Sequence, residues 1–173
     1  MTKITKKLSL LVLGILFSAA IIAGHYSSNT ATATNQQTIA QIASGNKKFT
    51  TLVAALKAAG LAKVLNQPGE YTVFAPTNAA FEKLPKGTLK TLLEPQNRDK
   101  LKAILLYHVV KGKVASSQVQ PGDVKTLEGS DIKVTTKGGK LIINNGADIV
   151  GTDINASNGV IHVIDAVLIP PQN

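Results

Sequence analysis

The sequence contains no cysteine. Disulfide bonds, thiol catalysis, cysteine-based metal sites and lipid attachment through a cysteine are therefore excluded. Small exported domains often depend on disulfides for their stability. A domain without them must be stabilised by a buried hydrophobic core, and a chain of 173 residues is long enough to form one.

Aromatic residues are also scarce, at 4% of the chain, and Arg98 is the single arginine among 19 basic residues. Proteins that bind nucleic acids usually cluster arginine and stack bases on aromatic side chains. Nucleic acid is therefore not an expected partner. The lysines are scattered, which indicates a solvated cationic surface with a weak attraction for anionic polysaccharide or membrane.

No acidic residue precedes Glu70, and the chain opens with three lysines followed by an apolar run from Leu8 to Ala23. A basic stretch, an apolar stretch and then small polar residues are typical of a secretory signal. We therefore predict a signal peptide and short tether in residues 1–33, cleaved after Ala23 or after Ala33. The alternative is an uncleaved leader that anchors the chain in a membrane.

Loss of the leader leaves 16 basic residues against ten acidic ones, a net charge of +6. Residues 34–37 are predicted to be a linker, residues 38–171 one folded domain and residues 172–173 a tail. We expect the domain to be monomeric and to lie in the extracellular space or a periplasm. Contact with a membrane is expected only if the leader stays uncleaved.

The first half of the domain has mainly helical patterns. Apolar residues recur at helical spacing after Thr38 and after Thr50 or Thr51, and Gly45 and Gly60 are stop signals. The exception is Tyr71–Ala75, a β-rich run that ends at Pro76. Further short helices are predicted around Leu61–Leu65, Ala79–Leu84 and Leu89–Leu93, and from Asn97 or Asp99 into the apolar segment Leu106–Val110.

Strand patterns dominate after Gly112. Ile132 and Val134 alternate with polar residues, and Leu141–Ile143 follows a Gly-Gly pair, so a hairpin is predicted. Asn-Gly turns are expected at Asn145 and Asn158, and further strands at Ile149, Ile154, Val160–Ile164 and Val167–Ile169. Helices in the first half and strands in the second, without regular alternation, indicate the α+β class.

Three segments form sequence boxes at compatible spacing. They are YTVFAPTNAAF at 71–81, LYHVV at 106–110 and NGVIHVID at 158–165, the last followed by LIPP at 168–171. In this order the boxes resemble the fasciclin domain, and the resemblance covers about residues 38–171. Three separate boxes are a far more specific signal than one short motif.

The resemblance implies a β-sandwich or wedge beside several short helices. It also implies adhesion or other interactions at a cell surface or in extracellular matrix, with a protein or anionic polysaccharide as partner and no cofactor. Animal adhesion proteins of the family usually carry several copies of the domain, whereas this chain has one. It also lacks Arg-Gly-Asp, so integrin binding is unsupported. The chain is therefore similar to single-domain exported proteins of bacteria.

Two residue pairs are candidate partner-binding sites on the resemblance alone. Asp153-Ile154 matches an Asp-Ile pair that animal members are reported to use for receptor contact, and Tyr107-His108 matches a second such site. Asp153 and Ile154 lie between two turn-prone stretches, which favours a short projecting segment where a partner docks. The alternative is a strand end with Ile154 in the core.

The other box residues are expected to be structural. Phe74 and Phe81 are predicted core residues, and Thr77 or Asn78 is predicted to cap a helix. His108 is expected to be half-buried, with its ring nitrogens bonded to backbone or polar partners, and His162 likewise. The residues interpreted as a structural motif are Phe74, Pro76, Thr77, Asn78, Phe81, Asn158, Gly159 and His162.

Metal binding and catalysis have little support. His108 and His162 would bind a metal only if the fold brought them close to a carboxylate such as Asp165. The sequence has no Gly-x-Ser-x-Gly, Gly-x-Gly-x-x-Gly or His-Glu-x-x-His motif, and no phosphate-binding Gly-Lys-Ser/Thr. The leading hypothesis is thus a non-enzymatic interaction module. The alternative is an exported hydrolase or sugar-active enzyme with a dispersed site, whose triad would need His108 or His162.

Overall fold

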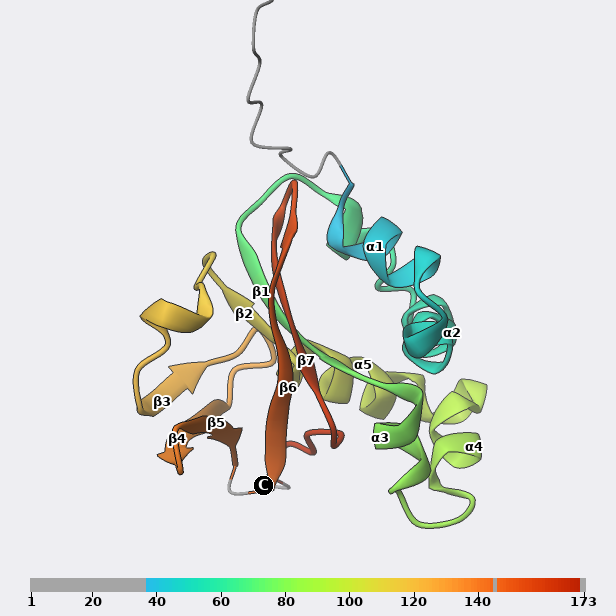
Figure 1. Cartoon of the computed structure of the whole chain (residues 1–173). Coiled ribbons are helices and arrows are strands. Elements are labelled where there is room, and N and C mark those ends of the chain that lie inside the picture. The colour runs from blue at the N-terminus through green and yellow to red at the C-terminus, as the bar shows by residue number, and fades with distance from the viewer. Residues whose placement is uncertain (1–36, 145, 172–173) are drawn as a thin grey trace, which may run out of the picture. The chain divides into compact units, whose positions relative to one another are not determined.

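The computed structural model describes residues 37–144 and 146–171 (Figure 1). The predicted signal peptide and tether, the tail and Asn145 lie outside the described residues. The α-helices are α1 (Ile39–Gly45), α2 (Thr50–Ala59), α3 (Asn78–Glu82), α4 (Thr88–Leu93) and α5 (Arg98–Tyr107). Single 3-10 turns are η1 (Lys47–Phe49), η2 (Val64–Asn66), η3 (Pro95–Asn97) and η4 (Ser116–Gln118).

Local capping signals explain where the first helices begin and end. Thr38 and Gln41 form a capping box at α1, in which each side chain accepts a hydrogen bond from the other residue's backbone N–H. Helix α2 ends at Gly60, whose φ of +74° is the left-handed conformation that glycine adopts without a steric penalty. The helix starts and stops predicted from these residues are confirmed.

One predicted helix extends too far. We expected the helix after Asn97 to continue into the apolar segment 106–110, but α5 ends at Tyr107 and Val109–Lys111 is strand β2. Two adjacent valines favour a strand over a helix because of their β-branched side chains. The His108 carbonyl accepts a hydrogen bond from Phe74 N at 2.9 Å, which joins this segment to the sheet.

The strands form one mixed sheet that curls back on itself. They are β1 (Tyr71–Pro76), β2 (Val109–Lys111), β3 (Gly122–Lys125), β4 (Asp131–Lys137), β5 (Lys140–Ile143), β6 (Ala147–Ala156) and β7 (Gly159–Ile164), in the order β2-β1-β7-β6-β5-β4-β3. Strands β1 and β7 are parallel, and the other neighbours are antiparallel. A bridge between Val110 and Thr126 joins the two ends, so the sheet is a near-barrel wedge.

The hydrophobic core has two parts on opposite faces of β1. In Figure 1, α1, α2 and α5 lie on one side of β1 and β7, and β3–β5 lie on the other. Successive side chains of a strand point to opposite faces. Val73 and Ala75 therefore join the core on the helix side, and Phe74 joins the core inside the near-barrel. The buried residues of this inner core are Phe74, Tyr107, Val110, Ile132, Ile143, Ala147, Ile164 and Leu168.

One predicted strand is absent from the sheet, and strand β3 was not predicted. Val167–Ile169 is irregular, because Leu168 N donates to the His108 ring and the following Pro170 has no N–H for a ladder. The sequence of β3, GDVK, has a single apolar residue and no alternation to detect.

The α+β class, with helices mainly first and strands mainly second, is confirmed. In residues 37–144 and 146–171, none of the helices has the length and apolarity of a membrane span.

Candidate functional site

The first box joins strand β1 to two helices. Thr77 Oγ1 accepts a hydrogen bond from Ala80 N at 3.3 Å and so caps α3. Asn78 has a different partner, because its Oδ1 accepts from Thr51 N at 3.1 Å and its Nδ2 donates to Lys47 O at 2.9 Å. Of the two predicted caps, Thr77 therefore caps its own helix and Asn78 binds the start of α2.

The two phenylalanines of this box are core residues, as predicted. Phe74 is 3% exposed and Phe81 is 7% exposed, and they lie in different parts of the core. Pro76 is buried and is the last residue of β1. These positions account for the box through packing and capping alone.

The start of the third box is a buried structural hub. The Asn158 side chain accepts from Ile39 N at 2.9 Å and donates to Leu65 O at 2.8 Å and to Gln67 O at 2.9 Å. Gly159 has a φ of +155°, and a Cβ there would collide with the Tyr71 carbonyl oxygen. The Asn-Gly turn thus connects α1, η2 and β1 to the sheet, and Gly159 permits the close approach to β1.

His108 is fully buried, not half-buried as the sequence predicted, because its ring lies in the core between α5 and the C-terminal segment. Its Nδ1 lies 2.8 Å from Ile104 O, and its Nε2 accepts from Leu168 N at 3.0 Å. These partners require a neutral ring with the proton on Nδ1. Burial lowers the pKa of His108 to about 4, although the Ile104 carbonyl opposes the change. Ile104, His108 and Leu168, joined by these two hydrogen bonds, are called the C-terminal seam below.

Tyr107 is also buried, at 2% exposure. Its hydroxyl donates to Asp131 O at 3.0 Å and accepts from Asn144 Nδ2 at 2.9 Å. Tyr107 and His108 therefore point into the molecule, and the partner contact that the resemblance implies for them would require the core to open. Their geometry explains this box by the packing of α5 against the inner core.

His162 has the opposite ring arrangement. It too is fully buried, not half-buried as predicted, because it lies on β7 between β1 and β6. Its Nε2 lies 2.9 Å from Val114 O, and its Nδ1 accepts from Asp153 N at 3.4 Å. The proton therefore resides on Nε2. The ring also packs beside Phe74, with centroids 5.7 Å apart. His162 thereby ties β6 and β7 to residues 113–121, the segment between β2 and β3 that we call the strap.

Asp153 does not lie on a projecting segment. It is inside β6, at an irregularity in the pairing with β7, and has a φ of +58°, an unusual conformation that Asp and Asn tolerate best. Ser116 N donates to Asp153 Oδ1 at 2.8 Å, and the Ser116 hydroxyl donates to Oδ2. These hydrogen bonds lower the pKa of Asp153.

Ile154 follows the alternative that the sequence left open. It pairs with Ile161 and packs against the helix-side core while remaining partly exposed. The prediction of a projecting segment is wrong, because the turn-prone residues on both sides of this pair belong to the single bulged strand β6. The two members of this pair thus have different roles, since Asp153 binds the strap and Ile154 packs on the core.

The fold brings Ser116, Asp153 and His162 together without forming a catalytic triad. In a triad the serine hydroxyl bonds the histidine ring and the carboxylate orients that ring. Here the serine hydroxyl donates to the carboxylate, and His162 Nε2 bonds the Val114 carbonyl. No hydrogen bond joins the Ser116 hydroxyl to the His162 ring, and the ring bonds the backbone of Asp153, not its carboxylate. The hydrogen bonds of this arrangement hold the strap.

Metal ligands do not converge in the described residues. Within residues 37–144 and 146–171, no group of three or more histidine, aspartate or glutamate side chains is placed to hold a metal ion. Asp165, the carboxylate suggested beside the histidines, instead pairs with Lys83 Nζ at 2.7 Å and accepts from Asp148 N at 2.8 Å.

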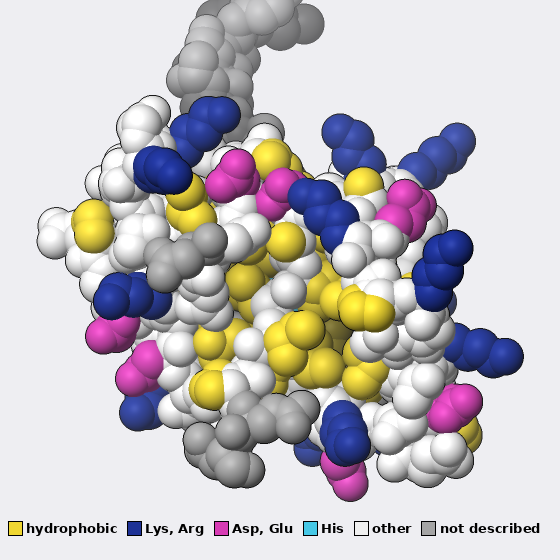
Figure 2. All heavy atoms as spheres, turned by 90° about the horizontal axis from the view of Figure 1, so that it is seen from below, with side chains coloured by type: hydrophobic (Ala, Val, Ile, Leu, Met, Phe, Trp, Pro, Cys, Tyr) yellow, Lys and Arg dark blue, Asp and Glu magenta, His cyan; other side chains and the backbone are white. Residues whose placement is uncertain are grey.

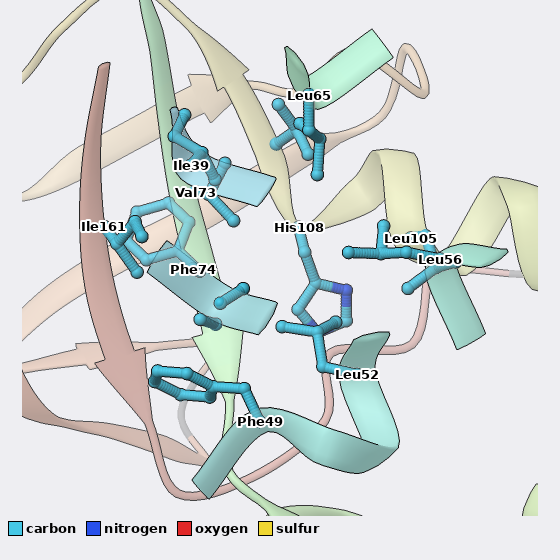
Figure 3. A pocket seen from close by; sticks show the side chains of 13 residues that line it. Ile39, Phe49, Leu52, Leu56, Leu65, Val73, Phe74, Leu105, His108 and Ile161 are labelled. Atoms are coloured by element: carbon cyan, nitrogen blue, oxygen red, sulfur yellow. The ribbon is translucent and has the colours of Figure 1, made fainter. Parts of the chain in front are cut away.

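The void next to His108 is too small for a ligand. Figure 3 shows the His108 ring among apolar side chains that include Leu52 and Leu105. The void has a volume of about 10 Å³, roughly the minimum for one water molecule. The region around the central box is therefore a packed core.

The comparison with known families agrees with this geometry. A model of the fasciclin domain matches residues 47–170. The chain belongs to the fasciclin domain family. Its box residues thus serve the fasciclin fold through caps, buried hydrogen bonds and core packing.

Relatives of known sequence and structure support the membership. The chain is 53% identical over 135 residues to protein sll1483 of Synechocystis, covering 78% of this chain and 74% of that protein. It is 40% identical over 141 residues to the cell surface glycolipoprotein MPB83 of Mycobacterium bovis, covering 79% and 62%. A FAS1 domain pair from the insect cell adhesion molecule Fasciclin I superposes with a TM-score of 0.68 and 20% identity, covering 78% and 51%. The predicted family and the wedge-like fasciclin fold are confirmed.

Proposed function

We propose that this fasciclin domain is an exported, non-catalytic interaction module that binds an anionic polysaccharide outside the cytoplasm. Membership of the family and the cell-surface designation of the MPB83 relative support the location. The hydrogen bonds from Ser116 and Val114 of the strap to Asp153 and His162 are structural ones, which supports the absence of catalysis.

The charge distribution favours an anionic partner. Every lysine of the described residues is exposed, as is Arg98. Among the described residues only two ion pairs form, Lys83–Asp165 and Lys125–Asp131. Fourteen of the 16 basic side chains in this part of the chain therefore remain available to a partner's negative charges.

The observation that carries the proposal is a like-charged pair at the end of the β4–β5 hairpin. Lys137 and Lys140 are directly opposite each other in the register. Like charges in that position repel, so a bound anion would relieve the repulsion. Lys140 also lines an open groove of about 410 Å³ together with the hydroxyl-bearing side chains of Ser117, Thr136 and Thr152. Hydroxyl groups beside a cationic pair suit a charged sugar chain.

A matched pair of double variants tests the site. Lys137→Gln with Lys140→Gln removes two charges from the hairpin, and Lys47→Gln with Lys48→Gln removes two charges from η1. On an immobilised anionic polysaccharide, we expect the hairpin variant to elute at clearly lower salt than the η1 variant. Wild type should elute last, and its retention should fall steeply with salt because exposed charges are screened over about 8 Å at physiological ionic strength.

Equal shifts for the two variants would mean that net charge alone governs retention, and would remove the hairpin site. Retention of the wild type that ignores salt would exclude the electrostatic mechanism. Binding measurements should be accompanied by thermal melts, and both variants should melt close to the wild type because surface changes usually alter stability by less than about 0.5 kcal/mol.

A protein partner is the second candidate, and the face seen from below the view of Figure 1 favours it. Figure 2 shows apolar side chains gathered at the centre of this face with charged side chains around them. An apolar centre within a polar rim is the arrangement of many protein interfaces. Capture of a protein from the envelope or extracellular fraction that survives high salt would favour this candidate over the polysaccharide.

Export itself is tested by the mass of the native protein. We expect a species that lacks Met1 and the following apolar run, recovered outside the cytoplasm. Recovery of a species that retains Met1 in the membrane fraction would replace cleavage with anchoring.

A further inference from the structure

A cavity of about 350 Å³ lies within the near-barrel under the strap. Its first wall is formed by β1 and β2 through Phe74 and Val110. The opposite wall is formed by β3 and β4 through Val124 and Val134. The strap, which connects β2 to β3 on the same side of Figure 1 as these strands, adds side chains of its own to the lining.

The inner part of this cavity is lined by apolar side chains. Phe74, Val110 and Val134 are buried members of its wall. The one buried polar side chain is Thr72, whose hydroxyl donates to Gly112 O at 2.7 Å and accepts from Val114 N at 2.9 Å. With both of these bonds made inside the protein, Thr72 has little polarity left to offer a ligand.

The rim is polar but carries no positive charge. Gln118, Gln120 and Asp123 line the cavity and are exposed, so they lie at its opening. Asp123 is the sole ionisable residue in the lining, although 16 basic residues are exposed elsewhere in the described part of the chain. An anionic ligand would meet a carboxylate and no counter-charge. A sugar would leave its hydroxyl groups without partners against the apolar walls.

We propose that this cavity binds an uncharged small molecule of mainly hydrocarbon character, with a single polar end directed to the glutamines at the rim. A dry cavity of about 150 Å³ lined by aliphatic and aromatic side chains accommodates benzene. A volume of about 350 Å³ therefore suits two fused or linked rings, or an aliphatic chain of about ten carbon atoms. Gln118 Oε1 accepts from Ala115 N at 3.3 Å, which leaves the Gln118 Nε2 to donate and the Gln120 amide to donate and accept; this suits a hydroxyl or amide group.

The strap closes this site, and its first half is held by the residues around His162. Val114 bonds both Thr72 and His162, and Ser116 bonds Asp153. The Ser116–Asp153 contact is the exposed one of this set. Opening of that contact would free the strap at the surface while the part-buried hydrogen bonds of Val114 stay in place.

The test uses N-phenyl-1-naphthylamine, an uncharged two-ring-system probe that fluoresces in apolar surroundings, with the full chain. Val124→Trp fills the cavity from β3, and Val150→Trp adds the same ring on β6 at a side chain that is 60% exposed and outside the lining. We expect wild type and Val150→Trp to bind the probe alike, and Val124→Trp to bind about tenfold or more weakly. Decan-1-ol should displace the probe at lower concentration than decanoate does.

Val119→Asp, on the strap, provides a second variant outside the sheet if Val124→Trp fails to fold, and it should also weaken the probe by about tenfold. Equal binding by the cavity variants and by Val150→Trp would overturn the proposal, because the probe would then occupy another part of the chain. Absence of binding by the wild type would also overturn it. Displacement by decanoate as effective as by decan-1-ol would refute the uncharged ligand class.

Discussion

The C-terminal seam and the strap are both held by a buried histidine, yet they differ in how they can open. At the C-terminal seam, His108 connects Ile104 to Leu168 within the core. At the strap, His162 bonds Val114, but the chain of contacts continues outward to the exposed carboxylate of Asp153. Only the strap therefore has a fastening that solvent reaches directly. The same residue type therefore supports a permanent closure at the C-terminal seam and an openable one at the strap.

The largest expected loss of stability comes from a substitution that affects the C-terminal seam and the strap together. Phe74 belongs to the inner core with Leu168, and its ring also packs beside His162. Phe74→Ala should therefore lower the free energy of unfolding by about 3–5 kcal/mol. Chemical denaturation measures this, with Val150→Ala as the exposed control, for which a change below about 0.5 kcal/mol is expected. A loss below about 1 kcal/mol for Phe74→Ala would show that the inner core is misassigned.

The next largest effect concerns the C-terminal seam, whose contribution to stability depends on pH through His108. The pKa of His108 is about 4 in the folded protein, below the value of 6.5 for a free histidine. The unfolded chain therefore takes up this proton first as the pH falls. The stabilising contribution is complete above pH 6.5 and is lost towards pH 4, by about 3 kcal/mol in total.

The check is the free energy of unfolding from pH 7 to pH 4 for wild type and for His108→Gln. Glutamine offers a donor and an acceptor but does not titrate in this range. We expect the variant to be less stable at pH 7 and to show a flatter pH dependence. Parallel curves for the two proteins would exclude His108 as the source of the acid sensitivity.

The smallest effect belongs to the exposed fastening of the strap. Asp153→Ala removes both acceptors for Ser116 and places alanine at a φ of +58°, so we expect a loss of about 1–2 kcal/mol. Asp153→Asn retains a side chain that tolerates this conformation and one acceptor oxygen, so its loss should be smaller. Thermal melts of both variants and of Ser116→Ala measure the difference. Equal losses for alanine and asparagine would argue against a backbone contribution.

Much of the local structure follows from the sequence because its causes are local. Thr38 caps α1, Gly60 ends α2 and the Gly138-Gly139 pair joins β4 to β5, and each of these is decided by residues within a few positions. The family could also be predicted, because the three boxes lie in characteristic order.

The candidate site was less predictable because its contacts join distant residues. Parallel pairing of β1 with β7 places residue 71 opposite residue 159, and no local signal specifies that pairing. Ser116 and Asp153 are 37 positions apart, and the bulge that turns Asp153 toward Ser116 arises within the assembled sheet. The sequence did hold one partial signal, because aspartate tolerates a positive φ better than most residues and Asp153 has a positive φ. From the sequence alone, however, the residues around Asp153 were predicted to form a loop.

Hydrogen exchange of single backbone amides tests the difference between the two regions most directly. The amides to compare are Leu168 N, bonded to His108, and Ser116 N, bonded to Asp153. We expect Leu168 to exchange only through global unfolding, with a free energy equal to that from denaturation, and Ser116 to exchange through a local opening of clearly lower free energy. Equal free energies for the two amides, or faster exchange at Leu168, would contradict the account of a permanent C-terminal seam and an openable strap.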